Sequence, residues 1–147
     1  MLIRRAIDAD VQAITMIVQQ AYAPYIGRIG KPPAPMLDDY RQIIAQAMVF
    51  VLEIDDGLIG VLVLEQQGDV LHLQNVAIGE QRRGRGLGGQ LMAFAEREAR
   101  ALGCRAIELY TNERMTENIL IYPHLGYQEM HRAAGDGYAR VFFRKAL

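Results

Sequence analysis

The fold is decided by the stretch Val76-Ala-Ile-Gly-Glu-Gln-Arg-Arg-Gly-Arg-Gly-Leu-Gly-Gly89, in which an apolar strand leads through a basic, glycine-rich turn into a helix. Glycines alternate at positions 84, 86 and 88, and a backbone without Cβ atoms can bring its N–H groups close to a ligand. The start of a helix adds unpaired donors and partial positive charge, and three arginines add full charges beside it. The stretch therefore predicts a site for a phosphate or pyrophosphate group.

The segments on either side of this stretch predict a sheet with one crossover. Upstream, 48–54, 58–65 and 70–78 are strand-like and separated by turns, which is typical of an antiparallel meander. Downstream, one apolar helical face runs from Leu87 to Leu102, Gly103 ends the helix, and 106–110 is a strand. A strand, a helix and a next strand indicate a right-handed crossover and a parallel pair.

The remaining segments complete one α/β (α+β) domain over residues 1–147. We expect a strand at 2–5, a helix from Asp8 to about Tyr22, a proline-rich loop at 25–36 and a second helix at 37–47. A short helix at 115–122, stopped by Pro123, precedes a terminal hairpin of 126–132 and 138–144. The prediction is a mixed, mostly antiparallel sheet of about seven strands flanked by about four helices.

Composition narrows the class of protein. The 147 residues are 51% hydrophobic and 22% charged, which is ordinary for a globular protein and excludes a disordered tail or a collagen-like rod. No apolar run is long enough to span a membrane, so a cytoplasmic protein is the default expectation. The net charge of −1 gives no reason to expect nucleic acid or a membrane surface as a partner. With Cys104 as the only cysteine, we expect neither a disulfide framework nor a cysteine-based zinc site, and we expect no metal cofactor.

One candidate for the phosphate ligand is a dinucleotide. The run Gly84-Arg-Gly-Leu-Gly-Gly89 matches the dinucleotide pattern G-x-G-x-x-G, and Glu108 lies 24 residues after Gly84 (108 − 84). In a dinucleotide fold, however, the first glycine directly follows the strand, whereas here residues 79–83 intervene and the preceding strands form a meander. The dinucleotide hypothesis is therefore disfavoured.

A second motif gives the chain a family resemblance. The turn Arg83-Gly-Arg-Gly86-Leu-Gly88 resembles the pyrophosphate motif Arg/Gln-x-x-Gly-x-Gly/Ala of the GNAT superfamily, whose members transfer acetyl from acetyl-CoA to an amine. The later stretch Leu120-Ile-Tyr122-Pro-His-Leu-Gly126-Tyr127 is similar to that family's Leu-Tyr-x-x-x-Gly-Phe. The resemblance implies a coenzyme A-binding core at about 48–147 and an acceptor side at about 8–47, where only the order of elements agrees.

The resemblance also implies roles for individual residues. Backbone N–H groups of the turn would hold the pyrophosphate, and the strand at 76–78, splayed from the next strand, would offer main-chain groups to the pantetheine arm. Tyr122 would protonate the leaving thiolate, and Asn118 would bond the pantetheine. The implied cofactor-binding residues are Val76, Ala77, Ile78, Arg83, Gly84, Arg85, Gly86, Leu87, Gly88 and Asn118.

The base that deprotonates the amine is predicted from the residues before Ile78. His72 lies where similar enzymes often carry a glutamate, and an imidazole titrates near neutral pH. Strand alternation would place His72, Gln74, Val76 and Ile78 on one face. Alternatives are a purely structural His72, a water held by Gln74 and Asn75, and the carboxylates of Glu65 and Glu108.

The acceptor pocket is expected to form from the loop between the first two helices. Its candidate residues are Tyr25, Arg28 and Met36, with Gln74 from the strand. Aromatic rings and the cations Arg28 and Lys31 would suit a small amine that bears an acidic group. Asp38 and Asp39 could instead attract a cationic amine, and the acceptor could be a peptide amine. The alternative function is a non-catalytic acyl-CoA-binding or sensing module on the same fold. A homodimer is a possible assembly.

Overall fold

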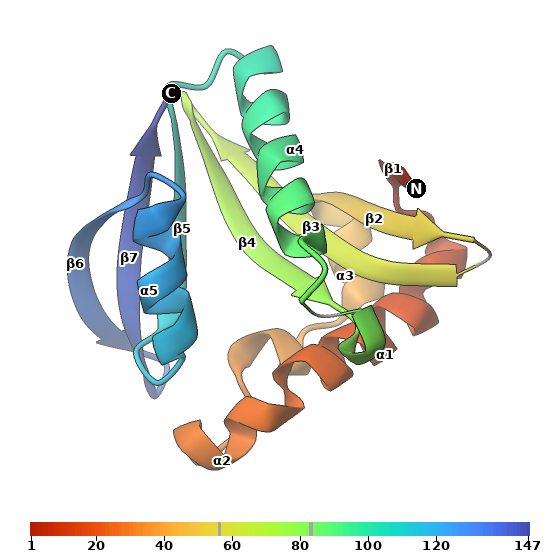
Figure 1. The fold of residues 1–147 in the computed structure, drawn as a ribbon, viewed down its shortest axis with the longest axis horizontal. Coiled ribbons are helices and arrows are strands. Elements are labelled where there is room, and N and C mark those ends of the chain that lie inside the picture. The colour runs from red at the N-terminus through yellow and green to blue at the C-terminus, as the bar shows by residue number, and fades with distance from the viewer. Residues whose placement is uncertain (56, 83) are drawn as a thin grey trace.

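The computed structural model describes residues 1–55, 57–82 and 84–147 and contains a seven-stranded sheet (Figure 1). The strand order is β1-β2-β3-β4-β5-β7-β6. The strands are β1 (Leu2–Arg5), β2 (Met48–Ile54), β3 (Gly57–Gln67), β4 (Val70–Ile78), β5 (Ala106–Asn112), β6 (Gln128–Gly135) and β7 (Tyr138–Ala146). Every neighbouring pair is antiparallel except β4 and β5, so the prediction of a mixed, mostly antiparallel sheet is confirmed.

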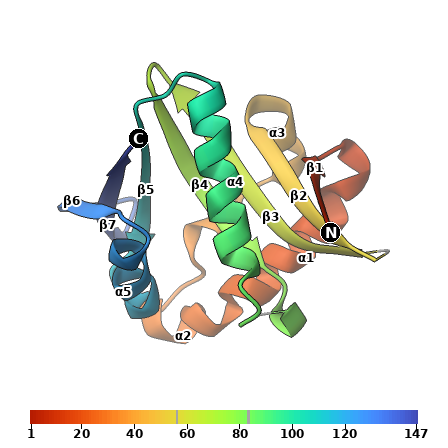
Figure 2. The same ribbon diagram turned by 45° about the horizontal axis from the view of Figure 1, so that its top comes forward.

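Helices cover both faces of this sheet (Figures 1 and 2). The helices are α1 (Val11–Tyr22), α2 (Ile26–Ile29), α3 (Tyr40–Gln46), α4 (Leu87–Ala101) and α5 (Thr116–His124). On one face, Leu91 and Ala95 of α4 pack on the leucines of the central strands, and Tyr122 of α5 joins the same apolar cluster. On the other face, Ile14 and Val18 of α1 pack on the valines of β2 and β3. Since side chains alternate along a strand, leucines and valines sort to opposite faces.

The segment predicted as a loop at 25–36 contains short helices. Proline is compatible with the first turn of a helix, where the backbone N–H has no partner, and Pro35 begins such a turn at Ala34–Leu37. The helix α2 ends at Gly30, whose φ of 87° is accessible to glycine at little cost. The next helix, α3, begins at Tyr40 rather than at Leu37, because the Asp39 side chain caps it.

A β-bulge in β4 makes the predicted face of His72 wrong. The β3 residues Val63 and Leu64 pair with Asn75 and Leu73, which leaves Gln74 as an extra residue. An extra residue shifts the alternation, so Val76 beyond the bulge packs with the α4 cluster, whereas His72 before it lies on the opposite face. The sequence pattern could not reveal the bulge, because it is defined by the pairing with β3.

The parallel pair opens toward the carboxyl ends of its strands. Pairing of β4 with β5 stops at Leu73 and Leu109, after which β4 continues along β3 and β5 continues along β7. The two strands diverge beyond that point (Figure 1), as the family resemblance implied. The divergence leaves the β5-facing backbone edge of 74–78 without a strand partner among the described residues.

Candidate active site

A cavity of about 260 Å³ lies where β4 and β5 diverge. The ends of both strands line it, together with the end of α1, the turn at 33–35, the first turns of α5 and the start of β7. Its wall includes the backbone of β4 from Leu73 to Ile78. A ligand in the cavity therefore meets main-chain donors and acceptors that strand pairing leaves available.

Tyr122 lines this cavity from α5. It is 8% exposed, and its ring packs against Tyr127 and Phe143 with centroids 5.8 and 5.5 Å away. Burial, with a smaller effect of Tyr25, raises the pKa of Tyr122 to about 12. The phenol is thus protonated at neutral pH and has a proton to donate inside the cavity.

A buried hydrogen-bond chain connects the acceptor side to β4. The Tyr22 hydroxyl donates to Oδ1 of Asn75 (2.6 Å), Nδ2 of Asn75 donates to the Tyr40 hydroxyl (3.0 Å), and Tyr40 donates to the carbonyl of Pro35 (2.7 Å). Asn75 is 5% exposed and sits directly after the bulge. The sequence contained one signal for this chain, the polar pair Gln74-Asn75 within an otherwise largely apolar strand, because a buried polar group needs partners.

The glycine-rich turn leads into α4 through two glycines with a left-handed backbone. Gly84 and Gly86 have φ values of 77° and 74°, and a Cβ placed on either would meet nothing within 4 Å. Packing within the protein therefore does not require glycine here, whereas the backbone conformation favours it. Leu87 anchors the helix start in the core, with Arg85 exposed beside it. Arg83 lies outside the described residues.

Asn118 is fixed at the cavity by neighbours on β5 and α5. Its Nδ2 donates to the Thr111 hydroxyl (3.1 Å) and contacts the Met115 sulfur (3.6 Å). Both neighbours are buried. With the amide nitrogen held in this way, its carbonyl oxygen is the group that remains for a ligand N–H.

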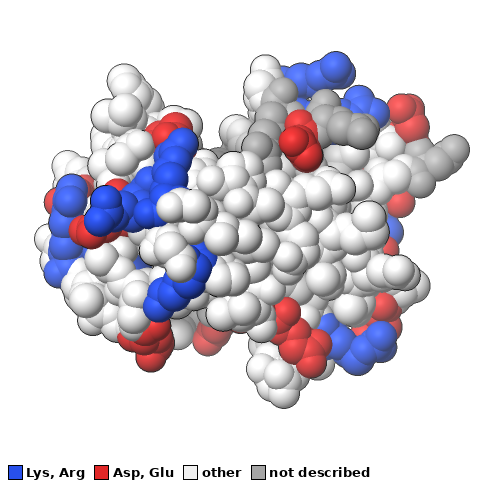
Figure 3. Space-filling view, turned by 90° about the horizontal axis from the view of Figure 1, so that it is seen from below, with Lys and Arg blue, Asp and Glu red and all other residues white. Residues whose placement is uncertain are grey.

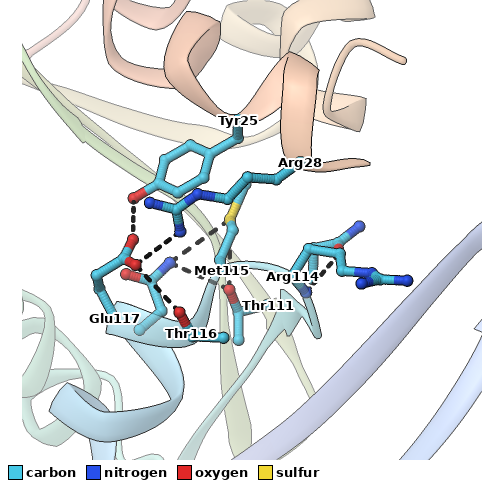
Figure 4. Close-up of polar contacts among 9 residues, drawn as sticks. Tyr25, Arg28, Thr111, Arg114, Met115, Thr116 and Glu117 are labelled. Carbon is cyan, nitrogen blue, oxygen red and sulfur yellow. Dashed lines mark hydrogen bonds and ion pairs between the residues drawn. The ribbon is translucent and has the colours of Figure 1, made fainter. Parts of the chain in front are cut away.

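A polar bridge joins α2 to the start of α5 (Figure 4). The Tyr25 hydroxyl donates to Oε2 of Glu117 (3.1 Å), and Nη1 of Arg28 donates to Oε1 (2.6 Å). The hydrogen bond from Arg28 lowers the pKa of Glu117. Tyr25 lines the cavity, but Arg28 is engaged with Glu117 and does not line it.

Residues 14–127 match the profile of the acetyltransferase (GNAT) family. The chain belongs to this family. It is 27% identical over 143 residues to the uncharacterized N-acetyltransferase YjgM of Escherichia coli K12, covering 91% of this chain and 86% of that protein. It is 31% identical over 80 residues to the aminoalkylphosphonate N-acetyltransferase of Salmonella typhimurium, covering 50% of this chain and 52% of that protein.

Solved structures agree with this assignment at the level of the fold. The PaiA N-acetyltransferase of Thermoplasma acidophilum in complex with coenzyme A superposes with a TM-score of 0.83 at 13% identity, covering 99% of this chain and 98% of that chain. As a GNAT acetyltransferase, the protein transfers an acetyl group from acetyl-CoA to an amine. Among the helices of the described residues, none combines the length and apolar character needed to cross a membrane.

The acetyltransferase cavity gathers seven of the sixteen predicted site residues. The predicted residues that line it are Val76, Ala77, Ile78, Asn118, Tyr122, Tyr25 and Gln74. Gln74, although exposed, donates to the Glu65 carboxylate from the bulge. Met36 instead packs against the α1 core, and His72 lines an adjoining cavity that shares Leu73, Gln74 and Tyr110 with the first.

Proposed function

We propose that Tyr122 is the proton donor of this acetyltransferase and that the free edge of β4 holds the acetyl carbonyl. The amine attacks the carbonyl carbon of the thioester, a C–N bond forms, and negative charge develops on the carbonyl oxygen. A backbone N–H of 74–78 is available to donate to that oxygen. When the C–S bond breaks, the coenzyme A thiolate takes the Tyr122 proton. The proposal rests on one observation: the buried, protonated Tyr122 hydroxyl and the unpaired β4 backbone line the same cavity.

The turn that begins α4 is the proposed pyrophosphate site. Gly84 and Gly86 open the space, and the first N–H groups of the helix have no partner within the helix. The helix dipole favours the pyrophosphate charge at the same place. Asn118 and the strand edge would then hold the pantetheine arm between this turn and the cavity.

The amine proton is proposed to reach His72 through water. An alkyl amine is mostly protonated at neutral pH, so a base must remove a proton before attack. His72 lies in the adjoining cavity, and Gln74 borders both cavities. A water beside Gln74 would connect them. A His72→Ala variant should shift the acid limb of the pH–rate profile, and His124→Ala, outside both cavities, should not. An unchanged limb would leave His72 with a structural role only.

The test of the donor is a pair of tyrosine variants. Tyr122→Phe should lower kcat by about 100-fold or more, the usual contribution of a positioned acid, with little change in the Kd of coenzyme A. Tyr127→Phe is the matched control, because its buried hydroxyl has no hydrogen-bond partner among the described residues. Thiol release gives the rate, and calorimetry gives the Kd. An equal kcat in both variants, or a loss of affinity that accounts for the lower rate, would contradict the role of Tyr122.

A further inference from the structure

Arg140 is the only charged residue among the described residues that line the active-site cavity. It extends from β7 on the face that also carries Tyr138, and it is half-buried. Its Nη1 donates to the carbonyl of Gly135 (3.0 Å). Its Cζ lies 4.8 Å from the ring centre of Tyr110 and 5.4 Å from that of Tyr138. Two aromatic rings and a backbone carbonyl thus fix the orientation of this guanidinium.

Arg140 has no carboxylate partner in the described part of the chain. Three other arginines each have one: Arg28 pairs with Glu117, Arg132 with Glu129, and Arg144 with Glu108. A guanidinium has five donors, of which the Gly135 carbonyl uses one. The remaining donors form a planar fork that matches a carboxylate or a phosphonate.

A second cation lies against the same tyrosine. Nζ of Lys31 is 4.1 Å from the ring centre of Tyr138, whose hydroxyl donates to the carbonyl of Pro32 (2.6 Å). Lys31 likewise has no carboxylate partner among the described residues. Two cations against one ring repel each other, and an anion bound between them would relieve this repulsion.

The rest of the cavity does not compete for such an anion. None of its described lining residues is an Asp or a Glu, and its other polar side chains are neutral amides and hydroxyls. Basic side chains gather at the left of the face in Figure 3, while the middle of that face carries few charges. A diamine acceptor would bring a second ammonium group toward Arg140 with no carboxylate to balance it.

We infer that the acceptor carries an oxyanion group, a carboxylate or a phosphonate, which binds Arg140 while its amine faces Tyr122 and the β4 edge. Lys31 adds a weaker, longer-range attraction. This inference rests on the proposed function for the position of the amine, but the anion site itself follows from Arg140, Tyr138 and Lys31. It also replaces Arg28, which sequence analysis selected as an acceptor cation, with a residue that no sequence pattern indicated.

Four acceptors of similar length test the inference: β-alanine, 2-aminoethylphosphonate, β-alaninamide and 1,3-diaminopropane. The wild-type kcat/KM for at least one of the two anionic amines should exceed that for the amide and the diamine by about 10-fold or more, as expected for a charge-assisted hydrogen bond. Whether the carboxylate or the phosphonate is preferred identifies the oxyanion. An equal or higher kcat/KM for the amide or the diamine would overturn the inference.

Substitutions of Arg140 and Lys31 provide a second test of the anion site. Arg140→Gln should bring the ratio of anionic to amide turnover close to one, and Lys31→Gln should lower it less. Arg132→Gln is the matched control, because this arginine lies on the neighbouring strand β6, pairs with Glu129 and does not line the cavity. Coenzyme A affinity reports that each variant is folded. If Arg140→Gln lowers the turnover of the anionic amine and of the amide equally, the inference is wrong.

A binding measurement separates this inference from the proposed catalytic roles. β-Alanine and 2-aminoethylphosphonate are titrated into the protein saturated with coenzyme A, and the Kd is compared between wild type and Arg140→Gln. Binding of either amine that weakens about 10-fold or more in the variant supports the anion site even if no amine is acetylated. That result would contradict the proposed catalytic roles but support the anion site at Arg140. If neither amine shows Arg140-dependent binding or turnover, the anion site is refuted.

Discussion

Replacing Gly86 with alanine should weaken coenzyme A binding, whereas the same replacement at Gly88 should not. Both positions have open space where a Cβ would lie, so the methyl group collides with no described atom in either case. The difference is in the backbone. Gly86 has a φ of 74° at the start of α4, whereas Gly88 lies inside the helix and has no positive φ. The family motif also accepts alanine at the position of Gly88.

The energetic cost of Gly86→Ala follows from the backbone conformation at this position. A left-handed conformation costs a residue with a Cβ about 1–2 kcal/mol. If the free turn relaxes in Gly86→Ala and must be restored on binding, the Kd of coenzyme A rises by about 5- to 30-fold. If the turn does not relax, the same cost lowers the free energy of unfolding instead. Gly88→Ala should be neutral or up to about 1 kcal/mol more stable, because alanine is the better helix former.

Calorimetric titration with coenzyme A measures the loss of binding, and chemical unfolding of the free protein measures the loss of stability. For Gly86→Ala, the loss of binding and the loss of stability should add up to about 1–2 kcal/mol. Equal Kd values and equal stabilities for the two variants would refute the argument, because the positive φ of the turn would then have no energetic consequence. A Gly88→Ala variant that binds as weakly as Gly86→Ala would also refute it.

Three further predictions concern polar contacts outside the turn. Asn75→Ala removes two buried hydrogen bonds and should lower the free energy of unfolding by about 2–3 kcal/mol in urea titrations, whereas Gln74→Ala at the exposed bulge should change it by less than about 0.5 kcal/mol. Asp10 has its pKa lowered by a hydrogen bond from Arg4, so its stabilisation is complete above the unfolded pKa and is lost as pH falls through the folded value. Asp10→Asn should therefore be about 1–3 kcal/mol less stable than wild type at pH 7, with a difference that narrows below about pH 3.9, and a gap independent of pH would contradict this assignment. Glu117→Gln weakens the contact between α2 and α5 and should raise the KM of the acceptor by about 2- to 5-fold with kcat unchanged, and an unchanged KM would show that the bridge does not shape the pocket.

Local chemistry in the sequence determined the elements and the cofactor side of the site. Apolar runs bounded by turns defined β2 and β4, helical spacing defined α1 and α4, and the glycines before Leu87 marked the turn that begins the helix. These signals are local because side-chain periodicity and φ preferences are properties of neighbouring residues. The parallel pair also followed, since a helix between two strands restricts how they connect, whereas its divergence was implied by the family resemblance.

Tyr25 and Gln74 were acceptor-side candidates from the sequence, but tertiary structure decided the rest of that side. The bulge at Gln74 arises only from pairing with β3, and it moved His72 to the other face from Val76. Arg140 is distant in sequence from Tyr110 and Lys31, and the insertion of β7 beside β5 is what brings these side chains together. No local pattern encodes such a meeting, because contacts between distant segments depend on how the whole sheet is ordered and on which charges remain unpaired once it has formed.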